Sequence, residues 1–442
     1  MTAATVAREP APATAPERRS ARAATTFGSI ALGALVACLV LLGANAASGR
    51  SSYVPSGARS FPAWLAGPLA PLGFTTSHTV LEGLVLAICG LYAVVLVCLP
   101  ALPARRVWLA IVLATLAAAL APPLLSGDAL GYLGFARLGV LHGLSPYSFT
   151  ANAAPRDAIY PYLTWRGASA VTTPYGPLFT LASYALVPLG IAGGLWALKF
   201  LAALTTLATV ALIWRIAARL GSSPKWAVGM YGLNPVVLIF AVGGAHNDTW
   251  FGLALAAAIL ALLRARESRS ALAAVAATAL KVSAVMLMPF ALIASTDRRR
   301  LFIWLAGALA VALVASLAVF GFSLDGIGHA LLSEQRDVAR HSLPNEVSML
   351  FGYGYHHLPE WIRVSFIAAF ALAVLGALWG AWRGLSWLDC YAWATLALLA
   401  ASSWLLPWYA MWVLLPASVS TSRRVKAGAL IASAYCVAIK IL

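Results

Sequence analysis

The sequence predicts an all-α integral membrane protein with many spans, and three observations carry this prediction. Of the 442 residues, 62% are hydrophobic and only 10% are charged, whereas a soluble protein of this length needs a charged exterior. Long apolar stretches recur, and about 20 apolar residues suffice for a helix to cross the hydrocarbon core. The basic residues gather at the ends of these stretches.

The net charge of +16 follows the pattern of a membrane protein. Its basic clusters flank the apolar stretches, and such clusters mark the cytoplasmic side of a bilayer. A nucleic-acid-binding protein would instead gather its bases on one soluble face. We therefore expect the lipid bilayer as a partner and exclude nucleic acid. The clusters are Arg18, Arg19 and Arg22; Arg105 and Arg106; Arg215 and Arg219; Arg264, Arg266 and Arg269; Arg298 to Arg300; and Arg423, Arg424 and Lys426.

Residues 1–26 lack periodicity and are rich in Ala, Pro, Thr and Arg, which predicts a disordered cytoplasmic tail. The first span, 27–47, ends in small residues and resembles a cleaved signal peptide. A retained signal anchor is favoured, because a long tail precedes it and further spans follow. Residues 27–442 are then one transmembrane domain in the bacterial plasma membrane (the cell inner membrane), with a cytoplasmic N-terminus.

The remaining apolar stretches bring the expected total to about 11 spans. The segment 177–189 is short for a crossing. The segment 271–294 has basic clusters on both sides and is interrupted by Lys281 and Pro289. It is predicted to be a pair of half-helices that enters and returns, a form tolerated where it lines a cavity. The further spans are expected near 79–100, 107–125, 195–214, 226–242, 250–263, 301–322, 361–381, 385–402, 404–416 and 427–442.

Threading the basic clusters inside leaves four outer loops, 48–77, 126–175, 243–249 and 323–360. These loops hold most of the 14 acidic residues. Acidic residues contribute little to topology, so their position calls for a functional explanation. They are Asp128, Asp157, Asp248, Asp325, Glu334, Asp337, Glu346 and Glu360.

The loop 126–175 opens with Asp128, directly where a span ends. Leucines then recur at helical spacing, with Arg137 and His142 among them, as in an amphipathic helix that lies in the membrane interface. A carboxylate here could accept a proton from an attacking hydroxyl. It could equally cap the free amides of the helix.

Two further motifs carry polar groups. The segment 173–178 reads Thr-Pro-Tyr-Gly-Pro-Leu and contains Tyr175, although proline is ordinary at a helix start. His246, Asn247 and Asp248 follow two glycines between two spans. They form either a tight turn or a donor–acceptor cluster suited to sugar hydroxyls.

Charged and aromatic residues elsewhere leave alternatives open. Lys281 lies inside an apolar stretch, where it either snorkels to the inner headgroups or makes an internal polar contact. Arg336 and Arg340 lie on the expected outer side and are either phosphate ligands or members of local Arg–Asp pairs. Trp408 and Tyr409 belong either to the interfacial aromatic belt or to a sugar-stacking surface.

The order of these motifs resembles that of the GT-C glycosyltransferases over roughly residues 107–416. The resemblance is carried by Asp128, Tyr147, residues 174–178 and 246–248, the Lys–Pro stretch and Pro407-Trp408-Tyr409. It is most similar to the actinobacterial polyprenyl-phosphomannose-dependent α-1,6-mannosyltransferases of the MptB type and to glycosyltransferase family 87. This implies a polytopic GT-C-type bundle with re-entrant half-helices and interfacial helices on the outer face.

The resemblance also implies a reaction. A hexose, expected to be mannose, would pass with inversion from a polyprenyl-phosphate donor to a glycan or glycolipid acceptor on the outer face. Asp128 would be the general base, and Arg137, Arg336 or Arg340 would balance the charge of the leaving phosphate. Ala129 stands where related proteins often have a second acid, so Asp157 or Asp248 would have to supply one. The remaining expected substrate-binding residues are Tyr132, Tyr147, Tyr175, His246, Asn247, Asp248, Trp408 and Tyr409.

No cofactor is expected. The sequence shows no metal-ligand spacing, its five cysteines lie in apolar runs, and a lipid-phosphate leaving group needs less metal assistance than a nucleotide diphosphate. The alternative function is a secondary transporter or lipid-linked sugar flippase, which would place ionisable residues near mid-membrane. Lys281, and less clearly Glu82 and Asp389, fit that description. A scaffold without chemistry would leave the polar outer loops unexplained.

Overall fold

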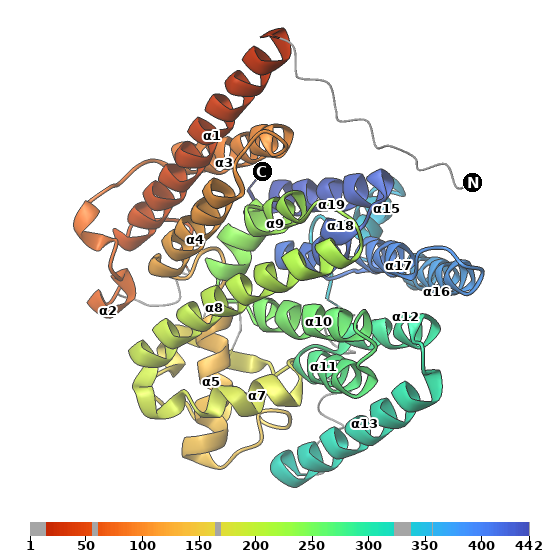
Figure 1. The fold of residues 1–442 in the computed structure, drawn as a ribbon. Coiled ribbons are helices and arrows are strands. Elements are labelled where there is room, and N and C mark those ends of the chain that lie inside the picture. The colour runs from red at the N-terminus through yellow and green to blue at the C-terminus, as the bar shows by residue number, and fades with distance from the viewer. Residues whose placement is uncertain (1–14, 55–60, 164–168, 322–336, 356, 442) are drawn as a thin grey trace.

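The computed structural model describes residues 15–54, 61–163, 169–321, 337–355 and 357–441, and throughout these ranges the regular elements are helices. Figure 1 shows them as one bundle. The longer helices are α1 (Ala15–Ala47), α3 (His78–Cys98), α4 (Ala104–Leu120), α5 (Asp128–His142), α7 (Pro177–Tyr184), α8 (Gly190–Arg219), α9 (Pro224–Gly232), α10 (Asp248–Leu262), α11 (Glu267–Leu280), α12 (Leu287–Ala294), α13 (Arg298–Phe320), α15 (Leu343–Leu350), α16 (Glu360–Trp382), α17 (Trp387–Ala401), α18 (Met411–Val419) and α19 (Arg423–Ile441).

Short elements connect these helices. They are α2 (Ala63–Ala66), η1 (Ala70–Leu72), η2 (Ala151–Ala153), α6 (Tyr160–Leu163), η4 (Val187–Leu189), the π-helical η5 (Val236–Val242), η6 (Val282–Met286) and η7 (Pro407–Ala410).

The chain is a multi-pass membrane protein, but the expected count of about 11 spans is not confirmed. Five helices of the described chain are long and apolar enough to cross a membrane. A sixth is obtained if α9 and η5, bent by 47°, form one span. Others that we expected as spans are shorter, among them α10 and α17. The five helices run over Arg19–Ala47, His78–Cys98, Val187–Arg219, Arg298–Phe320 and Glu360–Trp382.

Two helices of the N-terminal half differ from the expected ones. Helix α1 begins at Ala15, so residues 15–26 are helical rather than part of a disordered tail. The expected span at 226–242 is broken at Asn234-Pro235. Proline lacks an amide hydrogen for the helix ladder, and the Asn234 side chain accepts the Val236 amide at 2.9 Å instead.

The predicted interruption at Lys281 is present. Helix α11 ends at Leu280, and Lys281 has extended backbone angles of φ −154° and ψ 123° before η6 and α12 continue. Lys281 therefore lies at a helix break, where its side chain can turn toward the middle of the bundle.

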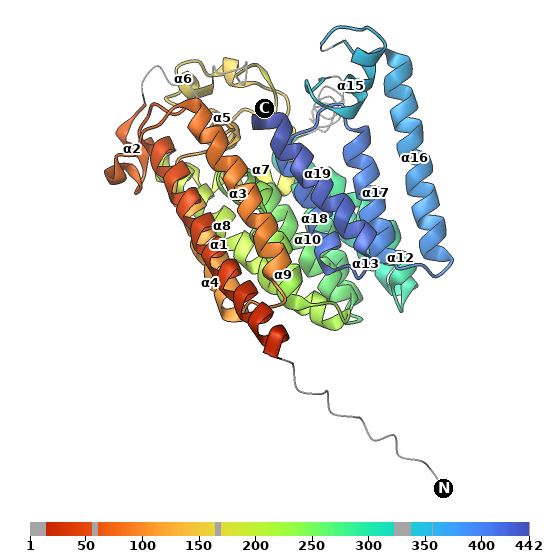
Figure 2. The same cartoon turned by 90° about the horizontal axis from the view of Figure 1, so that it is seen from above.

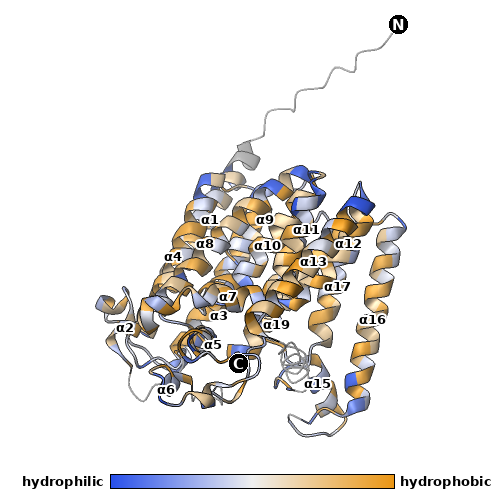
Figure 3. Ribbon diagram, turned by 90° about the horizontal axis from the view of Figure 1, so that it is seen from below, coloured by the Kyte–Doolittle hydropathy of each residue, from blue (hydrophilic) through white to orange (hydrophobic). Residues whose placement is uncertain are grey.

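The bundle has an apolar wall and two polar ends. Figure 3 shows hydrophobic residues along the helices, with hydrophilic residues gathered toward both ends. Figures 2 and 3 place α2, α6 and α15 at the same end, so segments of three expected outer loops share one face. The core runs through η5, all of whose side chains are fully buried. This element delivers the turn at residues 243–247 to the candidate site.

Candidate functional site

Asp128 is the first residue of α5, and its carboxylate faces residues of two motifs that lie farther along the chain. Tyr175 donates its hydroxyl to Asp128 Oδ2 at 3.2 Å, and His246 Nδ1 lies 3.4 Å from the same oxygen. The N-cap of α5 is Gly127, which has no side chain to cap the helix, and the Asp128 side chain stays 30% exposed. The role of Asp128, as a base or as a helix cap, stays a prediction.

The electrostatics keep this carboxylate ionised. Burial by itself would raise the pKa of Asp128, but the hydrogen bond and positive charge of His246 and the hydrogen bonds from Ser126 and Tyr175 together lower it below its usual value. Hydrogen bonds to the charged form of a carboxyl have this effect. Asp128 is thus an anion at neutral pH and can receive a proton.

His246 is held in place by a ring stack. Its imidazole lies parallel to the Trp408 indole, with centroids 3.6 Å apart and an interplanar angle of 23°. The Tyr132 hydroxyl lies 3.4 Å from His246 Nδ1 and accepts the Asn247 amide at 3.4 Å. His246, Asn247 and Asp248 are all buried. Their expected contact with sugar hydroxyls stays a prediction.

The backbone on both sides of the site is strained. Leu125, just before Asp128, has φ +60°, and Ala245, just before His246, has φ +57°. A non-glycine residue in this left-handed region costs about 1–3 kcal/mol and persists only where its surroundings enforce it. Strain of this kind gathers at functional sites.

Lys281 makes the internal polar contact that was one of its two interpretations. Its ammonium lies 2.9 and 3.0 Å from the two carboxylate oxygens of Asp248, and Asp248 Oδ1 also accepts the Trp412 indole N–H at 2.7 Å. The same ammonium lies over the rings of Tyr409 and Trp412, 4.5 and 4.9 Å from their centroids. Asp248 is 0% exposed, so its charge is fully compensated inside the protein.

Tyr147 supports the site from behind. It is buried, and its hydroxyl donates to the Tyr175 carbonyl at 2.9 Å and approaches Thr180 Oγ1 at 3.0 Å. The Tyr132 ring packs edge-on against that of Tyr175, with centroids 4.7 Å apart. These contacts fix the Tyr175 side chain beside Asp128.

Of the expected arginines, the two that the structure describes, Arg137 and Arg340, have partners outside this group. Arg137 binds Asp157 through two nitrogens at 2.7 and 3.2 Å, and His142 adds a third contact at 2.8 Å. Burial would raise the pKa of Asp157, but these partners and the Ile159 amide lower it. The guanidinium of Arg340 lies over the Tyr355 ring, 4.8 Å from its centroid. Arg336 lies outside the described residues.

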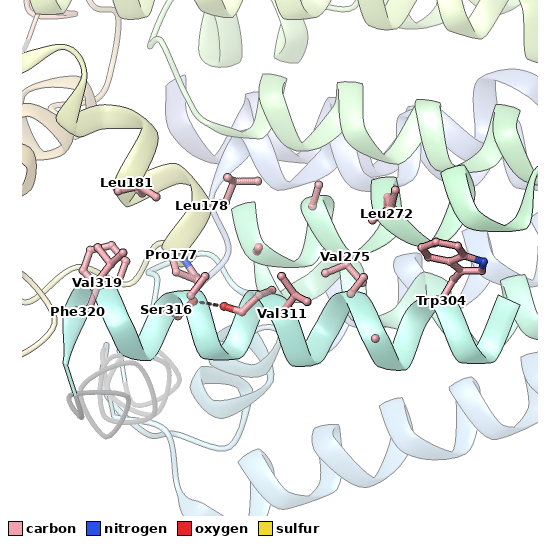
Figure 4. A pocket seen from close by; sticks show the side chains of 16 residues that line it. Pro177, Leu178, Leu181, Leu272, Val275, Trp304, Val311, Ser316, Val319 and Phe320 are labelled. Carbon is pink, nitrogen blue, oxygen red and sulfur yellow. Dashed lines mark hydrogen bonds between the residues drawn. The ribbon is translucent and has the colours of Figure 1, made fainter.

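Beside the site runs an apolar groove, one wall of which is α11, the first of the expected half-helices. It has a volume of about 510 Å³ and lies between α7, α11 and α13, as Figure 4 shows. Pro177, Val275, Val311 and Phe320 are among its lining residues. Ser316 also lines the groove, but its hydroxyl donates to the Ala312 carbonyl at 2.6 Å. The groove therefore presents an apolar surface.

Lys199, which is fully buried in the middle of α8, was not predicted from the sequence. It lies in an apolar stretch, and its partners are far away along the chain at residues 118, 242 and 243. The lysine itself was the available signal, because a charge within a span is rare and costly.

Across the described ranges, no three His, Cys, Asp or Glu side chains converge to bind a metal ion. The expected independence from metals and cofactors stays a prediction.

Comparison with known proteins agrees with the resemblance seen in the motifs. A family model described as alpha-(1->6)-mannopyranosyltransferase, N-terminal domain, matches residues 30–297. This range includes Asp128, Tyr175, His246 and Lys281, whereas Trp408 lies beyond it. No solved structure matches the chain.

Two curated relatives share the same name, alpha-(1->6)-mannopyranosyltransferase A. The protein of Corynebacterium glutamicum is 31% identical over 175 residues, covering 38% of this chain and 35% of the relative. That of Mycobacterium tuberculosis is 32% identical over 193 residues, covering 42% and 34%. The matched part thus spans about a third of each relative's length. Because the family model covers more than half of the chain, the chain belongs to the α-(1→6)-mannopyranosyltransferase family.

Proposed function

We propose that this protein is a membrane mannosyltransferase that moves mannose from a polyprenyl-phosphate donor to a hydroxyl of a glycan or glycolipid on the outer face of the membrane. The observation that carries the proposal is the position of Asp128. It is an ionised, partly exposed carboxylate held by Tyr175 and His246, next to a groove suited to a lipid chain.

Among the three acids Asp128, Asp157 and Asp248, Asp128 alone is both ionised and accessible to a substrate. Asp157 is bound by Arg137 and His142, and Asp248 by Lys281 and Trp412. Neither is open to a substrate proton. A single base that assists direct displacement by the acceptor hydroxyl gives inversion at the anomeric carbon. Retention would need a second carboxylate as nucleophile.

The lowered pKa of Asp128 determines the stage of the reaction at which the carboxylate takes the proton of the acceptor hydroxyl. A carboxylate of low pKa is a weak base toward a neutral alcohol. It becomes effective once the bond to the leaving phosphate is largely broken and the attacking oxygen has become acidic. Until then its negative charge stabilises the positive charge that develops on the sugar ring.

The groove fits the lipid part of the donor because it starts where the site ends. Helix α7, one wall of the groove, begins at Pro177, two residues after Tyr175. Gly176 packs so tightly against α11, the second wall, that a Cβ there would overlap the Ala279 carbonyl. The Gly176 amide also donates to the Leu280 carbonyl at 3.3 Å. Site and groove are thus joined rigidly, and the sugar would lie at Asp128 while the chain lies in the groove.

Lys281 is the cation best placed for the phosphate. It follows directly on α11, whose Val275 and Ala279 line the groove, and its side chain is 15% exposed. Arg137 and Lys281 each have a carboxylate partner, Asp157 and Asp248, and Lys281 is preferred because it directly follows a wall of the groove. Negative charge on the leaving phosphate would be stabilised by a preorganised cation.

The aromatic residues fall into two groups in this proposal. Tyr175 is partly exposed beside Asp128 and is positioned to contact the sugar. Trp408 is buried against His246, and Tyr409 lies under Lys281. These two therefore act by holding charged and hydrogen-bonding groups in place.

The proposal predicts that Asp128→Asn lowers mannosyl transfer by about 10²–10⁴-fold, the usual contribution of general base catalysis. The measurement is transfer of radiolabelled mannose from polyprenyl-phosphate mannose in vesicles that contain the purified protein. Asp157→Asn is the matched control, because it neutralises an outer-loop carboxylate outside the site, and it should keep transfer within a few-fold. Full activity of Asp128→Asn, or an equal loss in both variants, would contradict the assignment.

A further inference from the structure

Lys199 is the most deeply buried cation of the described chain, and the reaction proposed above does not use it. Its side chain is 0% exposed. Its ammonium lies 2.8 Å from the Ala118 carbonyl, 2.6 Å from that of Gly243 and 3.2 Å from that of Val242. Each of its three N–H groups thus has a backbone acceptor.

These acceptors belong to the C-terminal ends of two separate helices, which meet at the site. Ala118 lies in the last turn of α4, where helix carbonyls have no partner within the helix. Val242 and Gly243 end the π-helical segment η5. A cation at such carbonyl ends is favourable, because the helix dipole is negative there.

The Gly243 carbonyl links Lys199 to the segment that carries Asp128. It also accepts the Leu124 amide at 3.0 Å, and Leu124 precedes the strained Leu125. On its other side, Gly243 leads to the strained Ala245 and then to His246. One ammonium therefore holds the backbone that leads to both members of the Asp128–His246 contact.

Strained backbone of this kind persists only where the surroundings enforce it, and Lys199 supplies such a constraint. A buried charge is expensive inside a membrane protein and is typical of a functional position. We propose that Lys199 is a positioning residue that locks the 243–247 turn and thereby keeps His246 beside Asp128. This inference rests on the proposed function.

The test compares Lys199→Met with Lys225→Met. Both changes replace an ammonium that binds backbone carbonyls with an apolar chain of similar length. Lys225 binds the carbonyls of Pro100 and Leu102, at 2.9 and 2.7 Å, near the opposite end of α4. A displacement of about 1 Å at a reacting centre costs on the order of 100-fold in rate. Lys199→Met should therefore lower kcat by about 10- to 100-fold with little change in the donor KM, whereas Lys225→Met should change neither.

Hydrogen–deuterium exchange provides a readout that does not depend on mannosyl transfer. In Lys199→Met the amides of residues 243–247 should exchange faster, while those near Leu102 stay as in the unchanged protein. Lys225→Met should show the reverse. Lys199→Arg, which keeps a cation able to donate to carbonyls, should recover part of the protection and of kcat even if the methionine variant folds poorly.

The outcomes separate the two proposals. If the unchanged protein shows no mannosyl transfer, the proposed function is overturned. Faster exchange at 243–247 in Lys199→Met would then still support the positioning role of Lys199. Unchanged exchange and unchanged kcat in Lys199→Met would overturn the positioning role. Equal loss of kcat and of exchange protection in Lys199→Met and Lys225→Met would also overturn it, because the effect would then be one of general stability.

Discussion

At the scale of single residues, Asp128 and His246 form a pair in which one group reacts and the other tunes it. The imidazole lies 3.4 Å from the carboxylate and is clamped by Trp408. Because His246 helps to lower the pKa of Asp128, the carboxylate remains charged over a wide pH range. Its contribution to stability as an anion is present above its ordinary pKa and is lost only as the pH falls through the lowered value.

This pairing predicts a pH dependence. In the unchanged protein the acidic limb of kcat/KM should lie below the ordinary aspartate pKa of 3.8, because the base must be ionised. His246→Ala removes the strongest group that lowers that pKa, so the limb should move to higher pH. His142→Ala is the matched control, because His142 binds Asp157 instead. A limb that stays in place in His246→Ala would show that the histidine does not tune the base.

The sequence allowed part of this site to be predicted. Asp128, Tyr175 and His246 were each recognised, and the structure brings them together. Their assigned roles stay predictions. The pairing of Arg137 with Asp157 could not be foreseen, because a loop joins the two residues and its path depends on tertiary packing. Lys199 was missed although a lysine within an apolar stretch is a signal, and its partners could not be foreseen, because they are carbonyls, which every residue has and no sequence pattern marks.

At the scale of elements, the break at Lys281 matters most. An unbroken helix over 267–294 would carry this lysine along its own wall, whereas the break lets it reach Asp248. The break was predictable from a lysine and a proline in an apolar stretch. The π-helical segment η5 was not predicted, and its contact with Lys199 joins residues far apart in the sequence.

The groove between α7, α11 and α13 gives an element-scale prediction. Ala312→Trp would fill part of it, so the KM for a long-chain polyprenyl-phosphate mannose should rise by roughly tenfold, equivalent to about 1.4 kcal/mol of lost binding. A short-chain donor analogue should be affected much less. Val314→Trp, on an exposed face of the same helix, is the control and should leave both donors unaffected. An equal effect on long and short donors would place the lipid elsewhere.

At the scale of the whole molecule, composition alone predicted the all-α membrane class, and the structure agrees. The expected count of about 11 spans is not confirmed, because helices such as α10 and α17, with 15 residues each, are shorter than the roughly 20 residues that cross the hydrocarbon core. Such short helices are tolerated when protein surrounds them, as it does around the largely buried α10. The gathering of α2, α6 and α15 at one end of the bundle agrees with the expectation that the polar loops share a face.

The central claim is spatial: the sugar lies at Asp128 and the lipid chain lies in the groove that begins at Pro177. A structure of the protein with an unreactive analogue of polyprenyl-phosphate mannose tests it most directly. The account predicts the Asp128 carboxylate on the side of the anomeric carbon opposite the phosphate, the phosphate near Lys281 and the chain between α7, α11 and α13. A donor bound away from that groove, with Asp128 remote from the sugar, would contradict it.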